Sequence, residues 1–217
     1  MRRVIVYFDG FNFYNGLKAH CKTNPNWLNY YWIDLYKLCQ QFFTEGEGND
    51  LVQVKYFTAP PQNILKRSKQ SAFFGANLLL NNGKVSIHNG HYTQKEVECF
   101  AKCKEKFTIP EEKCTDVNLA LSIIEDCLDD KVDTIVIVTA DSDQIPTIKM
   151  VKARYPNKKL KVFFPPSRRS ADILGRVGQV VFLENHEEKF KVAKMPGQVT
   201  DGNKKYTRPA DWKYKPL

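Results

Sequence analysis

Short apolar runs alternate with amphipathic stretches along most of the chain. After Arg3, residues 3–8 consist of β-branched and aromatic side chains, and 134–139 are all β-branched, a pattern typical of strands buried on both faces. Weaker patterns of the same kind predict four further strands, at 51–58, 84–88, 159–164 and 179–183. Between the strands, five stretches predict helices, at 13–20, 33–43, 64–80, 116–128 and 143–154.

The stretch 116–128 has the clearest helical periodicity. Its apolar side chains predict the buried face of that helix: Val117, Ala120, Leu121, Ile124, Cys127 and Leu128. The repeated order of strand and helix predicts an α/β fold, in which a mostly parallel central sheet carries helices on both faces. We expect residues 1–186 to form this one main domain, because 217 residues with 42% apolar content suffice for one core.

Two polar segments depart from the pattern. Residues 89–115 are rich in Lys, Glu and Cys, and we expect an insertion or loop there. From residue 187 onward, eight Lys and Arg stand against four Asp and Glu, with several Pro and Gly, so 187–217 is expected to be a flexible basic tail, which Trp212 and Tyr214 could dock onto the domain. The chain carries a net charge of +9, which favours a polyanionic partner.

The expected location is the cytoplasm, without contact to a membrane. No apolar run approaches the roughly 20 residues of a membrane span, and the N-terminus passes directly into a short strand rather than a signal peptide. Six cysteines in a chain of this length are too few for a disulfide scaffold.

Four aspartates lie where strands and helices meet. Asp9 and Asp141 follow the two most apolar strands, Asp143 lies at a predicted helix start, and Asp116 opens the helix at 116–128. Each alone suits an ordinary turn or helix start. Because ligands of parallel sheets bind beyond the carboxyl ends of the strands, however, we expect all four at one rim. Carboxylates held together repel unless a cation neutralises them, and Mg²⁺ or Mn²⁺ prefers such oxygen ligands.

Other enzyme classes find less support. No Gly-x-Gly-x-x-Gly follows a strand and no Gly-x-x-x-x-Gly-Lys-Ser/Thr occurs, which disfavours dinucleotide cofactors and nucleotide triphosphatases. An aspartate-nucleophile phosphatase needs a second acid two residues after Asp9, where Phe11 stands. The four histidines lack a context that indicates a Ser-His-Asp or Cys-His hydrolase.

Residues 7–12, 115–120 and 139–146, which hold the four aspartates, resemble the acidic blocks of the NYN domain family, and 163–174 is similar to its closing block. The resemblance covers about residues 3–185. It implies a PIN-like three-layer sandwich and a Mg²⁺- or Mn²⁺-dependent endoribonuclease. The implied catalytic and metal-binding residues are Asp9, Asp116, Asp141 and Asp143, with Asn12 positioning metal or phosphate. Gln144 departs from the family, which often has an apolar or aromatic residue there.

We expect RNA as the partner, held by basic and aromatic residues near these blocks. The candidates for phosphate contacts are Lys113, Arg168, Arg169, Lys66, Arg67 and Lys69. Tyr14 is the candidate for stacking on a base, whereas Phe11 and Phe13 favour packing.

Three alternatives stay open at this point. The chain is either a nuclease or a non-catalytic RNA-binding or regulatory adaptor module with a vestigial metal site, and it is either a monomer or a homo-oligomer. A structural Zn²⁺ site is a less favoured expectation, because the spacing of its candidates is not a clean Cys-x-x-Cys pair: His88, His91, Cys99, Cys103 and Cys114.

Overall fold

A six-stranded parallel sheet forms the centre of the molecule. The computed structural model describes residues 1–43, 48–99 and 103–215. The strands lie in the order β3-β2-β1-β6-β7-β8, and every neighbouring pair is parallel. Their bounds are β1 Arg2–Asp9, β2 Asn49–Thr58, β3 Val85–Asn89, β6 Thr134–Val138, β7 Lys159–Phe164 and β8 Val180–Phe182. The six strands expected from the sequence are confirmed.

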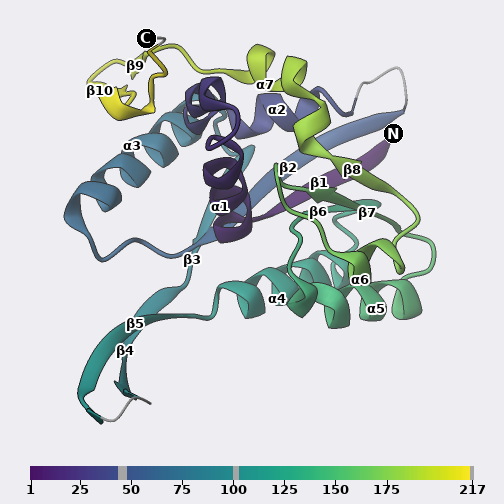
Figure 1. Cartoon of the computed structure of the whole chain (residues 1–217). Helices are drawn as coiled ribbons and strands as arrows, with labels where there is room; N and C mark the ends of the chain where they lie inside the picture. Colours follow the sequence, from purple (N-terminus) through teal and green to yellow (C-terminus); the bar gives the residue numbers. More distant parts are fainter. Residues whose placement is uncertain (44–47, 100–102, 216–217) are drawn as a thin grey trace.

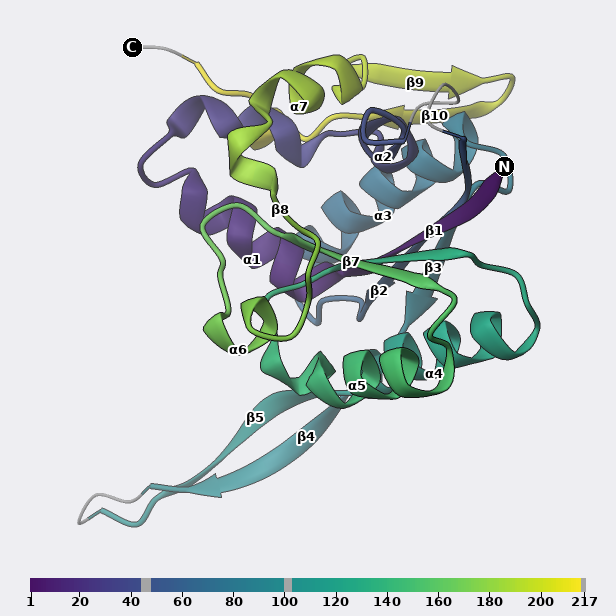
Figure 2. The same ribbon diagram turned by 90° about the vertical axis from the view of Figure 1, so that its right-hand side faces the viewer.

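Helices cover both faces of the sheet, as Figure 2 shows. On one face lie α1 Gly10–His20, α2 Leu35–Gln40, α3 Ile64–Leu80 and α7 Glu187–Ala193. On the other lie α4 Thr115–Leu128, α5 Ile145–Arg154 and α6 Ala171–Leu174. Short 3-10 helices are η1 Pro25–Tyr31, η3 Ser142–Gln144, η4 Leu183–Asn185 and η5 Ala210–Trp212. The expected three-layer α/β sandwich is therefore confirmed.

Both faces of β1 are buried, which explains its unbroken apolar sequence. Val6 and Phe8 belong to the core beneath α1, α2 and α3, while Ile5 and Tyr7 belong to the core beneath α4 and α5. Strands with two covered faces need apolar side chains at every position.

The direction of the strand order reverses at β1. From β1 the chain builds the sheet through β2 to β3 on one side, and later through β6, β7 and β8 on the other. Connections after β1 and after β6 therefore diverge, which leaves a crevice beyond the carboxyl ends of these two strands. Gly10 starts α1 directly at this crevice, where a Cβ would clash with the ring of Tyr56 and the carbonyl oxygen of Phe57.

The buried face predicted for α4 is largely wrong, because Cys127 is the one of its six side chains that is buried. Val117, Leu121 and Leu128 are 59%, 62% and 71% exposed, while the helix buries Leu119 and Ile123. Polar side chains decide this orientation, because the helix also turns Ser122 and Asp126 into the core. These two residues bind Lys55 of β2, as described below.

The segment expected to be an insertion or loop forms an antiparallel hairpin. Strands β4 His91–Glu98 and β5 Lys106–Lys113 pair with each other and extend away from the body between β3 and α4 (Figure 1). A ribbon that does not cover a core needs no alternating apolar face, so its polar sequence resembles that of a loop.

The expected flexible tail is also a misreading. Residues from 187 onward form α7 and a hairpin of β9 Gln198–Asp201 and β10 Lys204–Thr207. Phe190, Met195 and Val199 are buried in the main core. Tyr206 packs so closely on α3 that a Cβ on Gly75 would clash with its ring. Only a few buried side chains hold this segment to the core, and most of its other residues are polar or charged. Its composition alone therefore resembles that of a flexible tail.

None of the helices in the described part of the chain has the length and apolar content needed to cross a bilayer.

Candidate metal centre

Three carboxylates gather at the crevice beyond β1 and β6. Asp116 lies in the first turn of α4, Asp141 follows β6, and Asp143 lies in η3. One carboxylate oxygen from each lies within 4.8 Å of the others. Three segments that are separate in sequence thus offer hard oxygen ligands at one point, which is the donor set that suits Mg²⁺ or Mn²⁺.

The loop after β6 holds two of these carboxylates in a fixed arrangement. Asp141 accepts a hydrogen bond from the backbone N–H of Asp143 at 3.0 Å, and its own N–H donates to Oγ1 of Thr139 at 2.9 Å. The first bond is a cap at the start of η3. The cap places Asp141 and Asp143 side by side before any ligand binds.

Asp9 is buried beside the cluster rather than within it. Its side chain is 4% exposed. Oδ1 accepts the N–H of Asn12 at 3.0 Å, and Oδ2 accepts the hydroxyl of Thr139 at 2.8 Å. Burial raises the pKa of Asp9 to about 6, and the charges of Asp116 and Asp141 add to that rise, while the two hydrogen bonds oppose it. Asp9 is not among the three residues that share the 4.8 Å group.

Asp116 is held by the residue that departs from the family pattern. Gln144 is 1% exposed, and its Nε2 donates to Oδ1 of Asp116 at 3.4 Å. Burial raises the pKa of Asp116, and so do the charges of Asp141, Glu112 and Asp143, whereas the bond from Gln144 lowers it. A cation among these groups would relieve the repulsion that raises this pKa.

Asn12 connects two loops at the crevice. Its Oδ1 accepts the backbone N–H of Ala140 at 3.1 Å, while its own backbone N–H donates to Oδ1 of Asp9, the N-cap of α1. The side chain therefore joins the start of α1 to the segment that carries Asp141. Through this contact Asn12 positions the loop that carries Asp141.

Sequence reasoning missed three contributors: Thr139, Gln144 and Glu112. Thr139 was visible only as part of the last acidic block, although it bridges Asp9 and Asp141 through one hydroxyl. Glu112 on β5 accepts the N–H of Thr115 at 3.0 Å and so fixes the start of α4. Glu112 lies in the segment for which the sequence predicts an insertion or loop, so nothing in the sequence indicates that it fixes the start of α4.

The candidate RNA contacts occupy segments that follow strands at the same edge of the sheet. Arg168 and Arg169 follow β7, and Lys66 and Arg67 lie in the first turn of α3, after β2. Lys113 ends β5, just before α4.

Several of these cations already have partners. Arg169 pairs with Glu184 at 2.8 Å, and Lys113 pairs with Glu111 at 2.7 Å. Arg67 donates to the carbonyl of Pro61, and Lys69 pairs with Asp211. Both Arg169 and Lys113 remain exposed, so their pairs are of the surface kind that contributes little and can exchange with a phosphate.

Tyr14 projects from α1 and is 41% exposed, with its ring 5.6 Å from that of Tyr31.

The structure does not bring the candidate zinc ligands together. Among the described residues, the group of three or more side chains close enough to share a metal ion is the acidic cluster, and it contains no His or Cys. Cys99 and Cys103 lie at the far end of the β4–β5 hairpin, whereas His88 stacks on Phe57 at its base.

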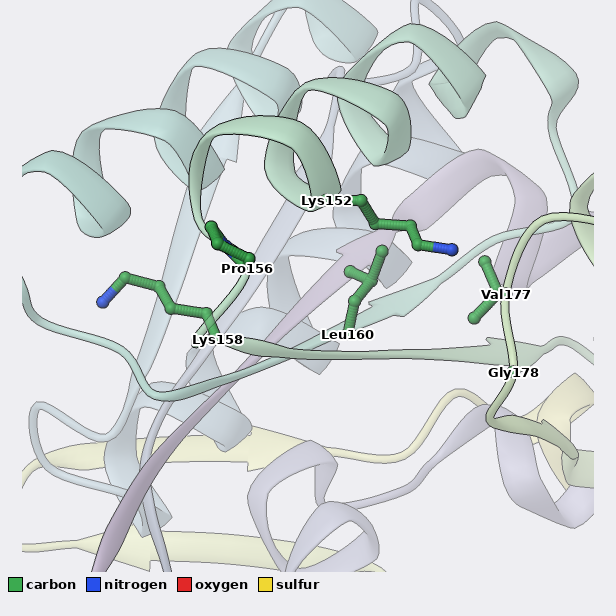
Figure 3. A pocket seen from close by; sticks show the side chains of 6 residues that line it. All are labelled: Lys152, Pro156, Lys158, Leu160, Val177 and Gly178. Atoms are coloured by element: carbon green, nitrogen blue, oxygen red, sulfur yellow. The ribbon is translucent and has the colours of Figure 1, made fainter.

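A pocket of about 210 Å³ lies at the opposite edge of the sheet, where α5 leads into β7 (Figure 3). Two lysines border it, and both are bound to backbone: Lys152 donates to the carbonyl of Arg176 and Lys158 to that of Val132. It lies at the amino ends of the strands and is not part of the acidic centre.

Comparison with known proteins establishes the class of this protein. Residues 3–183 match the model of the NYN domain, so the chain belongs to the NYN domain family, a nuclease-like family. The resemblance seen in the acidic blocks is confirmed.

Two individual proteins are similar to the chain. It is 29% identical over 202 residues to 6-hydroxy-3-succinoylpyridine 3-monooxygenase HspA of Pseudomonas putida, with 78% of this chain and 62% of that protein covered. The chain thus spans less than two thirds of that relative's length. A crystal structure of a protein of unknown function from Vibrio parahaemolyticus shares the fold, with a TM-score of 0.53 and 18% identity, covering 83% of this chain and 91% of that one.

Proposed function

We propose that this protein is an endoribonuclease that hydrolyses RNA phosphodiester bonds with the help of Mg²⁺ or Mn²⁺. The observation that carries the proposal is the convergence of Asp116, Asp141 and Asp143 at the crevice of a nuclease-like fold. Asp116, Asp141 and Asp143 would hold the ion, with Asp9 behind them. A divalent ion at such a site supplies Lewis acidity and an activated water for attack on a phosphate.

The residues around the cluster prepare it for an ion. Thr139 and Asn12 hold Asp9 and the loop of Asp141 in place, and Gln144 orients Asp116. Such partners of ligand side chains set ligand geometry and raise metal affinity. The buried carboxyl of Asp9, with its pKa near 6, is mostly ionised at pH 7, and a cation in the cluster would stabilise that charge.

The exposed basic residues at the same edge support RNA as the substrate. Arg168 and Arg169 after β7, Lys113 before α4 and Lys66 at the start of α3 flank the crevice on different sides. These cations would attract the phosphates of an RNA backbone, and the net charge of +9 strengthens that attraction. Tyr14 on α1 offers a ring on which a base can stack.

The name of the Pseudomonas relative suggests a different reaction, the oxygenation of a pyridine derivative. Non-haem iron oxygenases bind their metal with two histidines and one carboxylate. In the described part of the chain the cluster consists of three aspartates, without a histidine. The donor set therefore favours phosphate chemistry over that of a non-haem iron oxygenase.

Cleavage of a fluorescent single-stranded RNA tests the proposal. We expect cleavage in Mn²⁺ or Mg²⁺ that stops on addition of EDTA. Asp141→Asn should lower the rate at least about 100-fold, because it removes a charged ligand. Asp129→Asn, at an exposed aspartate just after α4, serves as the matched control and should leave the rate unchanged. RNA binding without EDTA-sensitive cleavage would instead support the non-catalytic RNA-binding module.

A further inference from the structure

A polar cavity of about 530 Å³ lies between α4 and the edge strand β3. Its polar lining consists of Lys55, His88, Asn89, Asn118, Ser122 and Glu125. The volume falls within the range of sites that hold small molecules. Among the residues assigned to the acidic centre above, none lines this cavity.

The cavity lies on the far side of α4 from the acidic cluster. Asp116 and Asn118 are two residues apart in the first turn of α4, and a helix turns about 200° over two residues. Asp116 is bonded to Gln144 on the η3 side, whereas Asn118 faces the cavity beside β3. The cluster and the cavity therefore adjoin the same turn of α4 from two sides.

The floor of the cavity is rigid and buried. Lys55 and Ser122 are each only 8% exposed. The ammonium of Lys55 donates to Oδ2 of Asp126 at 2.6 Å and to the hydroxyl of Ser122 at 3.2 Å. Tyr7 donates to the same oxygen of Asp126 at 2.7 Å. This network fixes two lining side chains before any ligand binds, which lowers the entropic cost of binding.

His88 forms a fixed wall of the same cavity. Its ring stacks on Phe57 with centroids 4.7 Å apart, and Ser86 Oγ lies 2.9 Å from its Nε2. Burial lowers the pKa of His88, and the charge of Lys55 lowers it further. Both effects favour the neutral ring, which offers one donor and one acceptor.

The charges of the lining select against an anion. The positive charge of Lys55 is neutralised by Asp126, and Glu125 adds a carboxylate at the mouth. What remains is a mixture of donors and acceptors, with the amides of Asn89 and Asn118 offering both kinds. Amide side chains pair well with the edges of bases, and carboxylates accept from the amino group of cytosine. Leu121 and Ile87 add apolar surface for a ring.

We propose that this cavity is a base-binding subsite, which holds one nucleobase of the strand whose backbone lies at the acidic cluster. The inference rests on the proposed function for RNA as the source of the base. It adds a recognition element on the other side of α4, where Asn118 and Asn89 read the base edge and Leu121 packs on the ring.

Binding of the four nucleosides to the full chain in EDTA tests the subsite, with inorganic phosphate as the anionic probe. We expect at least one nucleoside to bind saturably and phosphate not to displace it. Asn118→Ala should weaken binding about tenfold or more, the loss typical of one base-edge contact. Asn82→Ala, at an exposed turn residue after α3, is the matched control and should change it less than about twofold.

Two further binding measurements test the subsite separately from the nuclease proposal. Asp141→Asn should leave nucleoside binding unchanged, and a short RNA should bind more tightly than its best nucleoside. Failure of all nucleosides to saturate, or full binding by Asn118→Ala, would overturn the subsite even if RNA is cleaved. Equal affinity for nucleoside and RNA would overturn its link to a strand. Nucleoside binding without any cleavage would leave the cavity as a base site and overturn the nuclease.

Discussion

At the scale of single residues, the buried carboxyl of Asp9 is the most informative group of the centre. Its folded pKa is about 6, against an ordinary value of 3.8. The folded protein thus holds this proton more tightly than the unfolded chain does. The resulting stabilisation is present below about pH 4 and is lost as the pH rises through 6.

This shift predicts a difference between the wild type and Asp9→Asn in EDTA. Between pH 4 and pH 7 the unfolding free energy of the wild type should fall, relative to that of the variant, by about 2.4 kcal/mol. Urea denaturation at a series of pH values measures the difference. Mn²⁺ at pH 7 should restore stability to the wild type, because a cation compensates the buried charge. If the unfolding free energies of the two proteins change in parallel with pH, the raised pKa of Asp9 is contradicted.

Gln144 carries a second prediction at this scale. Its hydrogen bond orients Asp116, so Gln144→Leu should lower the Mn²⁺ affinity about 10- to 100-fold. Calorimetric titration with Mn²⁺ measures the change. Gln179→Ala, at an exposed position before β8, is the control. An unchanged affinity in Gln144→Leu would show that Asp116 needs no such partner.

At the scale of elements, α4 shows where periodicity misleads. Its apolar residues define two stripes, and the stripe with more of them is exposed at Val117, Leu121 and Leu128, although its Cys127 is buried. Asp126 and Ser122 face inward because Lys55 of β2, a buried cation, needs them. A single lysine in a strand was not a sufficient signal to foresee this pairing, since the partners lie far apart in sequence.

The orientation of α4 predicts unequal costs for one substitution at two leucines. Leu119→Ala should reduce the unfolding free energy by about 2–5 kcal/mol, because Leu119 is fully buried. Leu128→Ala should cost less than about 0.5 kcal/mol, because that side chain is 71% exposed. Denaturant unfolding at fixed pH compares the two variants directly. Equal costs, or a larger one at Leu128, would mean that the helix faces the other way.

At the scale of the whole molecule, the strands and their order with the helices followed from the sequence, since buried parallel strands have a distinctive pattern. The positions of Asp9, Asp141 and Asp143 followed as well, from strand ends and helix starts. The β4–β5 hairpin and the C-terminal segment did not. The hairpin covers no core, and the anchors of the C-terminal segment, such as Phe190 and Trp212, are single aromatic residues among charges, so only the folded core shows what they pack against.

The C-terminal segment yields a prediction about the whole fold. Ending the chain at residue 186 removes Phe190, Met195 and Val199 from the core. Each buried side chain of this size contributes about 1.5–3 kcal/mol, so we expect Tm to fall by more than about 10 °C. Ending the chain at residue 213 retains these anchors and should leave Tm nearly unchanged. If the chain that ends at residue 186 has the same Tm as the full chain, the C-terminal segment does not stabilise the fold.

The central claim is that Asp116, Asp141 and Asp143 hold a divalent ion, and anomalous scattering from crystals soaked in Mn²⁺ tests it most directly. The predicted result is a peak at the crevice beyond β1 and β6, with carboxylate oxygens of at least two of these aspartates about 2 Å from the ion. A well-occupied peak elsewhere, with the three carboxylates bare, would contradict the claim.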